Sequence, residues 1–216
     1  MRAVYSYIIS LVLYASASSC CRCDIHCQPD IPDGDLTVMY DWSLSPDAHP
    51  EGMAILLYPV ADENTRPWRH DVSPSGGKIE APAVPTRAIT FNNGTESVLF
   101  DHENNFFLYR AYTDTGNLTD GLNEAYSGSL PASRHAVEER VVRQPDMLWR
   151  YAAETMEVTG DSTTFVPTQA VARYSYTVTG IEGLDGVARC CAAITGLTPG
   201  ILMYSGETYD TETVTL

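Results

Sequence analysis

The chain alternates apolar and polar residues over short stretches, which is a pattern of β-strands rather than of helices. In residues 36–42, LTVMYDW, the residues Leu36, Val38, Tyr40 and Trp42 recur at every second position. This spacing predicts a strand with one buried face that includes Trp42. Residues 53–59, MAILLYP, are apolar throughout, which indicates a strand covered on both faces. Helical periodicity does not continue beyond one or two turns, so the sequence predicts an all-β fold.

Turn residues separate further strands at intervals that are typical of a β-sandwich. Asn93 and Gly94 are expected to form a turn between two strands. Pro67 cannot donate a ladder hydrogen bond, so residues 66–72 should form an edge strand. The remaining strands are expected within residues 78–82, 86–92, 95–100, 104–113, 138–142, 170–180, 186–196 and 200–206.

Three segments carry more specific expectations. Residues 114–135 are polar and rich in turn residues, and we interpret them as a loop. Pro145 suits the first position of a helical turn, which we expect to continue to Tyr151. In residues 170–180, the side chains at every second position are expected to face inward; these are Ala172, Tyr174, Tyr176 and Val178.

Residues 1–19 have the layout of a secretory signal peptide. Arg2 supplies a positive charge, residues 7–14 form an apolar run, and residues 15–19 are small. The apolar run is too short to span a bilayer. We therefore expect residues 1–19 to be removed from the mature protein.

Cys20 directly follows Ser18 and Ser19, as in a lipoprotein signal. In such signals, the cysteine receives a diacylglycerol and becomes the new N-terminus. Ala17 occupies a position where many bacteria have leucine, and cleavage before Cys21 is the alternative. The sequence thus predicts lipid attachment at Cys20, followed by a tether over residues 20–34 that is rich in turn residues.

The cysteine cluster also allows other interpretations. Cys20, Cys23, His26 and Cys27 could supply four metal ligands, but structural zinc sites usually take two ligand pairs from separate turns, and no second pair follows. Lipidation of Cys20 leaves five cysteines: Cys21, Cys23, Cys27, Cys190 and Cys191. An odd number leaves at least one thiol free or intermolecular, and the sequence does not establish any pairing. We favour lipidation over disulfides and over a metal site.

The composition restricts the classes of partner. The chain has 28 acidic and 13 basic side chains, a formal net charge of −15. An acidic surface repels phosphate backbones, so we expect no nucleic-acid partner. It also repels anionic headgroups, so membrane attachment has to come from a lipid rather than from a basic patch.

The sequence contains no recognisable set of catalytic residues. The histidines are scattered, and no H-E-x-x-H, G-x-S-x-G or P-loop spacing occurs. Asp101 and His102 are adjacent, and we interpret them as an exposed turn. The acidic stretches at residues 30–35 and 114–121 lack the ligand spacing of a calcium loop. We assign no catalytic, cofactor-binding or metal-binding residue.

Aromatic side chains could serve a different class of function. Trp42, Trp68 and Trp149 could stack on sugars if they were exposed. Trp42 lies in the apolar stripe of its strand, so a place in the core suits it better than a glycan platform.

Several blocks in order resemble a family of Bacteroidetes surface lipoproteins related to the fimbrial anchor and assembly proteins of type V pili. The blocks are the Ser18-Ser19-Cys20 signal end, DLTVMYDWS, PEGMAILLYP, TFNNGTE, RQPDMLW and GLDGVARCCAAITGLTPG. Each block alone is unspecific, but the ordered set covers nearly the whole chain.

The resemblance implies tandem transthyretin-like β-sandwich modules and an outer-membrane lipid anchor at the cell surface. The modules are expected at residues 35–135 and 136–216. The second module is expected to be incomplete at its C-terminus. The implied function is non-enzymatic: anchoring or assembling a fimbria-like structure through β-strand addition to pilin-like subunits. The alternative is a glycan-binding surface lipoprotein of a nutrient-uptake system, which exposed aromatics on one face would favour.

Overall fold

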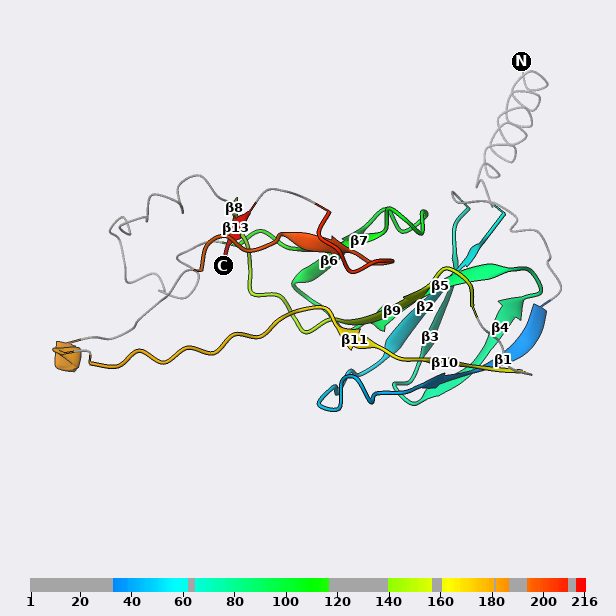
Figure 1. Cartoon of the computed structure of the whole chain (residues 1–216), viewed down its shortest axis with the longest axis horizontal. Helices are drawn as coiled ribbons and strands as arrows, with labels where there is room; N and C mark the ends of the chain where they lie inside the picture. The colour runs from blue at the N-terminus through cyan, green and yellow to red at the C-terminus, as the bar shows by residue number, and fades with distance from the viewer. Residues whose placement is uncertain are drawn as a thin grey trace, which may run out of the picture. The chain divides into compact units, whose positions relative to one another are not determined.

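The computed structural model describes residues 33–61, 65–116, 140–156, 161–180, 182–186, 194–209 and 213–216. Their regular structure consists of β-strands and one short 3-10 helix, η1 (Leu184–Gly186) (Figure 1). The all-β fold expected from the sequence is confirmed. In these ranges there is no helix with the length and apolar character needed to cross a membrane.

The first sheet has three strands in the order β10–β1–β4. These are β10 (Ser162–Phe165), β1 (Asp33–Tyr40) and β4 (Gly76–Pro82). β1 runs antiparallel to β4 and parallel to β10. Leu36 and Val38 are buried, whereas Met39 is 44% exposed. Successive side chains of a strand point to opposite faces, so β1 presents one face to the core as expected.

The second sheet has five strands in the order β11–β9–β5–β2–β3. These are β11 (Thr168–Gln169), β9 (Trp149–Ala153), β5 (Thr86–Asn92), β2 (Met53–Pro59) and β3 (Trp68–Val72). β2 is buried over its whole length, which confirms the strand covered on both faces. β3 lies at the edge of the sheet, as Pro67 just before it predicts.

The third sheet has the order β12–β7–β6 and is antiparallel. Its strands are β12 (Gly200–Leu202), β7 (Arg110–Thr113) and β6 (Val98–Asp101). A separate parallel pair joins β13 (Val214–Thr215) to β8 (Arg140–Val141).

Two hydrophobic clusters use opposite faces of the five-stranded sheet. Ile55 and Leu57 of β2 pack with residues of the first sheet, among them Leu36, Val38, Ile79 and Phe165. Ala54, Leu56 and Tyr58 of the same strand pack with residues of the third sheet and its loops, among them Val98, Phe106, Tyr109, Ala111 and Met203. The five-stranded sheet is therefore the middle layer, and the burial of both of its faces explains the continuous apolar run of β2.

The expected helical turn from Pro145 to Tyr151 is wrong, because residues 149–153 form β9. Asn92 at the end of β5 receives a hydrogen bond from the Trp149 amide (2.8 Å). β9 then pairs antiparallel with β5, with Thr90 opposite Tyr151. These sheet contacts outweigh the local preference of a proline for a helix start.

The expected strand over residues 104–113 is also shorter than predicted. Asn105 accepts hydrogen bonds at its side-chain oxygen from the amides of Phe107 and Leu108 (3.0 and 3.1 Å). Its carbonyl accepts a further bond from the Tyr109 amide (2.8 Å). An asparagine that binds nearby amides in this way stabilises a turn, and β7 begins only at Arg110.

The strands on the two sides of the Asn93–Gly94 turn are confirmed, but they belong to different sheets. β5 lies in the five-stranded sheet, and β6 lies in the third sheet. Strands from both expected modules share sheets as well, since β9 pairs with β5 and β10 pairs with β1. The module boundary between residues 135 and 136 stays a prediction.

Candidate functional site

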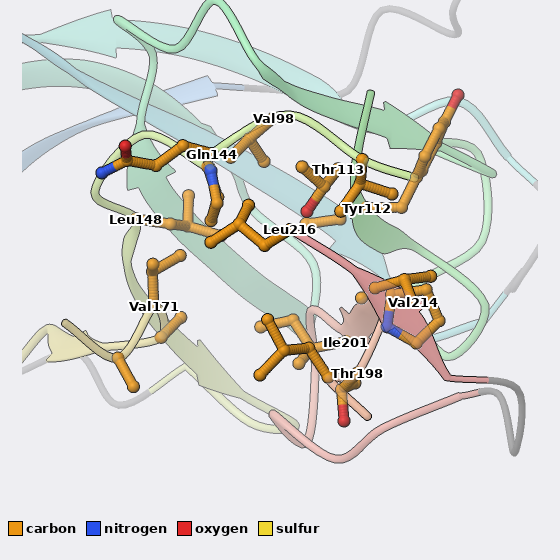
Figure 2. Close-up of a pocket in the computed structure, with 18 of the residues that line it drawn as sticks. Val98, Tyr112, Thr113, Gln144, Leu148, Val171, Thr198, Ile201, Val214 and Leu216 are labelled. Atoms are coloured by element: carbon orange, nitrogen blue, oxygen red, sulfur yellow. The ribbon is translucent and has the colours of Figure 1, made fainter. Parts of the chain in front are cut away.

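An apolar groove of about 890 Å³ lies beside the third sheet and the β8–β13 pair (Figure 2). Four segments that are far apart in the sequence line it together with the ends of β6 and β7. The segments are residues 142–148, 170–174, 194–201 and 214–216. In Figure 2, aliphatic side chains gather around the same space; they include Val98, Leu148, Val171, Ile201, Val214 and Leu216.

Residues 142–148 are held against the rest of the fold by two polar side chains. Asp146 Oδ2 accepts hydrogen bonds from the amides of Glu96 (2.6 Å) and Ser97 (2.7 Å). Hydrogen bonds from Ser97 and its neighbours hold the pKa of the Asp146 carboxyl below its usual range, although partial burial opposes this effect. A carboxylate that receives backbone amides thus fixes this wall of the groove to the start of β6.

Asn92 fixes the other end of the same wall. Its side-chain nitrogen donates to the Met147 carbonyl (3.0 Å), and its oxygen accepts from the Trp149 amide (2.8 Å). Asn92 is buried, and a buried amide group that uses both donor and acceptor on one backbone stretch leaves that stretch little freedom.

The opposite wall is a short antiparallel pairing near the C-terminal residues. Leu197 and Val214 exchange two backbone hydrogen bonds (3.1 and 2.8 Å), and Ile194 and Leu216 do the same (2.9 and 2.8 Å). The Val142 amide donates to the Thr215 carbonyl (2.9 Å) on the other side of this strand. Residues 214–216 are therefore bonded on both sides and form a fixed wall.

Residues 171–180 leave the groove as an extended segment that belongs to no sheet of the described structure (Figure 1). The expectation that its apolar side chains face inward is wrong. Tyr174 is 73% exposed, Tyr176 is 65% exposed and Val178 is 62% exposed. The sequence has the two-residue alternation of a half-buried strand, but no described sheet covers the apolar face.

The first residues of this segment connect it physically to the groove. Val171 and Tyr174 line the groove, and the Ala170 amide is bonded to the Leu148 carbonyl (2.7 Å). An exposed extended segment with unpaired backbone in the described structure therefore starts at the apolar groove. Such a combination can accept an extended peptide, because the segment provides backbone hydrogen bonds and the groove provides room for alternate side chains.

The residues singled out from the sequence lie elsewhere. Cys20 and the other five cysteines, together with His26, lie outside the described residues, as does most of the expected loop at residues 114–135. Asp101 ends β6 rather than lying in a turn, whereas His102 is exposed, has φ 60° and begins the turn that follows, as expected for that residue. A hydrogen bond from Arg110 (2.8 Å) and one from the His102 amide hold the pKa of the Asp101 carboxyl below its usual range.

The three tryptophans occupy three different environments. Trp68 packs against the cluster between the first and second sheets. Trp149 begins β9 and is half-buried. Trp42 is also only half-buried, and it lines a second, smaller hollow. The expectation that Trp42 belongs to the core is therefore wrong, because the apolar stripe of β1 reaches the surface after Tyr40.

Comparison with known proteins places the chain among relatives with a related fold. A family model described as a domain of unknown function, DUF5119, matches residues 19–216. The chain is 24% identical over 197 residues to Fim4B, a candidate fimbrium anchoring subunit of Bacteroides ovatus. This match covers 89% of the chain and 54% of the relative, so the chain spans about half of the relative's length. The resemblance to fimbrial anchor proteins is confirmed.

One solved structure shows a similar fold. The chain matches a candidate adhesin from Bacteroides ovatus with a TM-score of 0.62 and 21% identity, over 85% of this chain and 61% of that one. A candidate polysaccharide-binding protein from Bacteroides thetaiotaomicron matches with a TM-score of 0.47 and 9% identity, over 84% of this chain and 63% of that one.

Proposed function

We propose, from the finding that the chain belongs to the DUF5119 family, that it anchors or assembles a fimbria-like structure at the cell surface. The named relative is a candidate fimbrium anchoring subunit, and the fold is shared with a candidate adhesin. Both relatives support a role in surface attachment rather than in catalysis. The groove and the exposed segment beside it suggest how a partner subunit is held.

One observation carries the proposal: an extended segment with an exposed apolar face begins at an apolar groove. Tyr174 and Tyr176 together with Val178 form that face, and all three are more than half exposed. Aromatic and β-branched side chains of this kind favour paired strands. A fimbrial subunit supplies the missing neighbour by adding a strand along residues 172–179.

The groove gives this addition its register. Side chains on one face of the incoming strand lie two residues apart and enter the space lined by Leu148, Val171 and Leu216. The fixed walls favour binding, because little backbone has to be ordered when the partner arrives. The backbone bonds give affinity, and the shape of the groove selects the apolar residues of the partner.

A lipid at Cys20 holds this assembly at the outer membrane. The small residues Ser18 and Ser19 precede that cysteine, and the family match begins at residue 19, which supports a mature protein that starts near Cys20. Residues 20–32 serve as the tether, which is shorter than the expected 20–34 because Asp33 and Gly34 already pair with β4 as the start of β1. Two or three acyl chains on one cysteine give stable membrane attachment, whereas a single chain gives only marginal binding.

The proposal is tested by affinity capture of surface proteins from the parent cells. The wild-type chain should recover fimbrial subunits, identified by mass spectrometry. A Tyr174→Ser/Tyr176→Ser variant should recover at least about tenfold less, since aromatic anchors dominate binding energy. Leu108→Ser is the matched control, because Leu108 is 54% exposed and does not line the groove.

Two outcomes would contradict the proposal. One is recovery of fimbrial subunits that the double tyrosine variant leaves unchanged. The other is recovery of glycan-transport proteins in place of fimbrial subunits, which would favour the alternative function in nutrient uptake. Circular dichroism spectra of all variants should match, since the two tyrosines are exposed.

A further inference from the structure

A second hollow lies at the end of β1, away from the groove residues. Its volume is about 540 Å³, and its lining includes Tyr40, Trp42, His49, Pro50 and Pro74. These residues come from β1, from the loop that follows it and from the turn between β3 and β4. The hollow is independent of the groove proposed to hold a partner strand.

The two aromatic side chains of the hollow are fixed by hydrogen bonds from their polar atoms. Trp42 Nε1 donates to the Pro74 carbonyl (2.9 Å). The Tyr40 hydroxyl lies 2.6 Å from Thr90 Oγ1, and Thr90 in turn donates to the Ala54 carbonyl (2.8 Å). Tyr40 is therefore the donor to Thr90. With both polar ends bound to the protein, the rings present carbon surfaces to the hollow, already oriented for a ligand.

The spacing of the rings indicates a compact ligand. The centroids of Tyr40 and Trp42 are 5.9 Å apart, and the planes differ by 31°. A polyproline helix repeats every three residues, or about 9 Å, so two rings at this spacing do not match successive turns of a proline-rich peptide. A single pyranose ring, with an apolar face of C–H groups, has the size that these rings can contact together.

The polar surroundings favour a neutral ligand. His49 is exposed at the hollow, and its imidazole can bind a hydroxyl group as donor or acceptor. The lining residues have three exposed acidic sequence neighbours, Asp41, Asp47 and Glu51, and residues 40–52 contain no lysine or arginine. None of these carboxylates lines the hollow, but their negative charge disfavours phosphate, sulfate and uronic acids there.

We infer that the hollow at Tyr40 and Trp42 is a binding site for one neutral hexose unit of a glycan. The pyranose stacks on the Trp42 ring above Tyr40, and its hydroxyls bind His49. A subunit with this site contacts neutral surface glycans in addition to its protein partner. The site does not depend on the partner strand, so either function can fail without the other.

Ligand-observed NMR with the full chain tests this inference. The probes are the methyl glycosides of glucose, galactose, mannose and N-acetylglucosamine. At least one should give saturable binding in the millimolar range, and Trp42→Ala should weaken it about tenfold, in line with the loss of an aromatic anchor. His49→Ala should weaken it about threefold without a change in melting temperature, because His49 is exposed. The control Leu44→Ala changes a 64% exposed side chain of the same loop that does not line the hollow, and it should bind as the wild type does.

Three results would overturn the inference. The first is that none of the four glycosides saturates, and the second is that binding persists unchanged in Trp42→Ala and in His49→Ala. The third is saturable, Trp42-dependent binding of a proline-rich decapeptide, of methyl glucuronide or of choline when the neutral glycosides fail. In that case the hollow would be a site for a peptide, an anionic sugar or a quaternary ammonium group.

Discussion

Ser97 and Asp146 form reciprocal hydrogen bonds at the groove wall, although they are 49 residues apart. The Ser97 amide and hydroxyl both donate to Asp146 Oδ2 (2.7 and 2.9 Å). The Asp146 amide in turn donates to Ser97 Oγ (2.9 Å). This reciprocal contact joins residues 142–148 to the strand β6 (Val98–Asp101). The geometry of the groove therefore depends on the ionised form of one carboxylate.

Asp146→Asn should lower the free energy of unfolding by about 1 kcal/mol at pH 7. The value is at the low end for hydrogen bonds to a charged group, since the carboxylate is only partly buried. The pKa of Asp146 is depressed in the folded protein, so its contribution is present above the unfolded-state pKa of about 4 and is lost as the pH falls through the folded-state value. Urea denaturation of both proteins at pH 7 and at pH 3 measures this.

The difference between wild type and Asp146→Asn should shrink at pH 3. Asp47→Asn is the control, because Asp47 is exposed, and its stability should follow that of the wild type at both pH values. A difference for Asp146→Asn that stays the same at pH 3 would show that its carboxylate does not hold the groove wall.

Asn92→Leu should destabilise the protein by about 2 kcal/mol. The substitution keeps the size of the side chain but leaves the Met147 carbonyl and the Trp149 amide without their partner, and unsatisfied buried groups cost about 1–3 kcal/mol each. Asn92→Asp keeps the acceptor for Trp149 but loses the donor to Met147. In thermal unfolding, the wild type should have a higher melting temperature than both variants. Equal melting temperatures for wild type and Asn92→Leu would show that the hydrogen bonds of Asn92 to Met147 and Trp149 do not stabilise the fold.

Cys20→Ala should abolish acyl labelling of the chain and release it from the membrane fraction of the parent cells. Labelling with an alkyne-tagged fatty acid and fractionation measure the two effects. Cys21→Ala separates the two cleavage positions, because it should retain the lipid if cleavage occurs before Cys20. Membrane fractionation of Cys20→Ala that equals the wild type would rule out this anchor.

The sequence predicts a strand and its burial well where the strand lies in the interior of the fold. The run at residues 53–59 indicates burial on two faces, and β2 (Met53–Pro59) lies in the middle sheet. The sequence-based prediction is wrong at residues 145–151 and 104–109. There the buried Asn92 and the turn residue Asn105 determine the backbone conformation through hydrogen bonds that periodicity does not reveal. Trp42 continues the apolar alternation of β1, and only the structure shows that the stripe has reached the surface.

The groove could not be predicted from local patterns, because its walls come from segments that meet only in the folded chain. Leu148 lies in the block RQPDMLW, which indicates a family but not a groove, and no motif surrounds Leu216. The alternation of Tyr174, Tyr176 and Val178 did indicate an extended segment with an apolar face at residues 171–180. Periodicity gives the face of a strand, but it does not say whether this chain or a partner covers that face.

Proline substitution tests whether the exposed segment pairs through its backbone. Residues of odd and even number in a strand direct their amides to opposite edges, so only one edge faces the partner. Either Thr177→Pro or Val178→Pro should abolish capture of fimbrial subunits, whereas Thr177→Val and Val178→Ala should retain most of it. Capture by both proline variants at the wild-type level would exclude backbone pairing along residues 172–179.

Hydrogen–deuterium exchange of residues 172–180 tests the central proposal most directly. In the free chain, the amides of this segment should exchange rapidly, since no described strand pairs with them. When a captured fimbrial subunit is bound, residue-resolved exchange should slow at alternate amides from Ala172 to Thr179, together with slower exchange around the groove. Unchanged rapid exchange of this segment in the complex would contradict strand addition at this site.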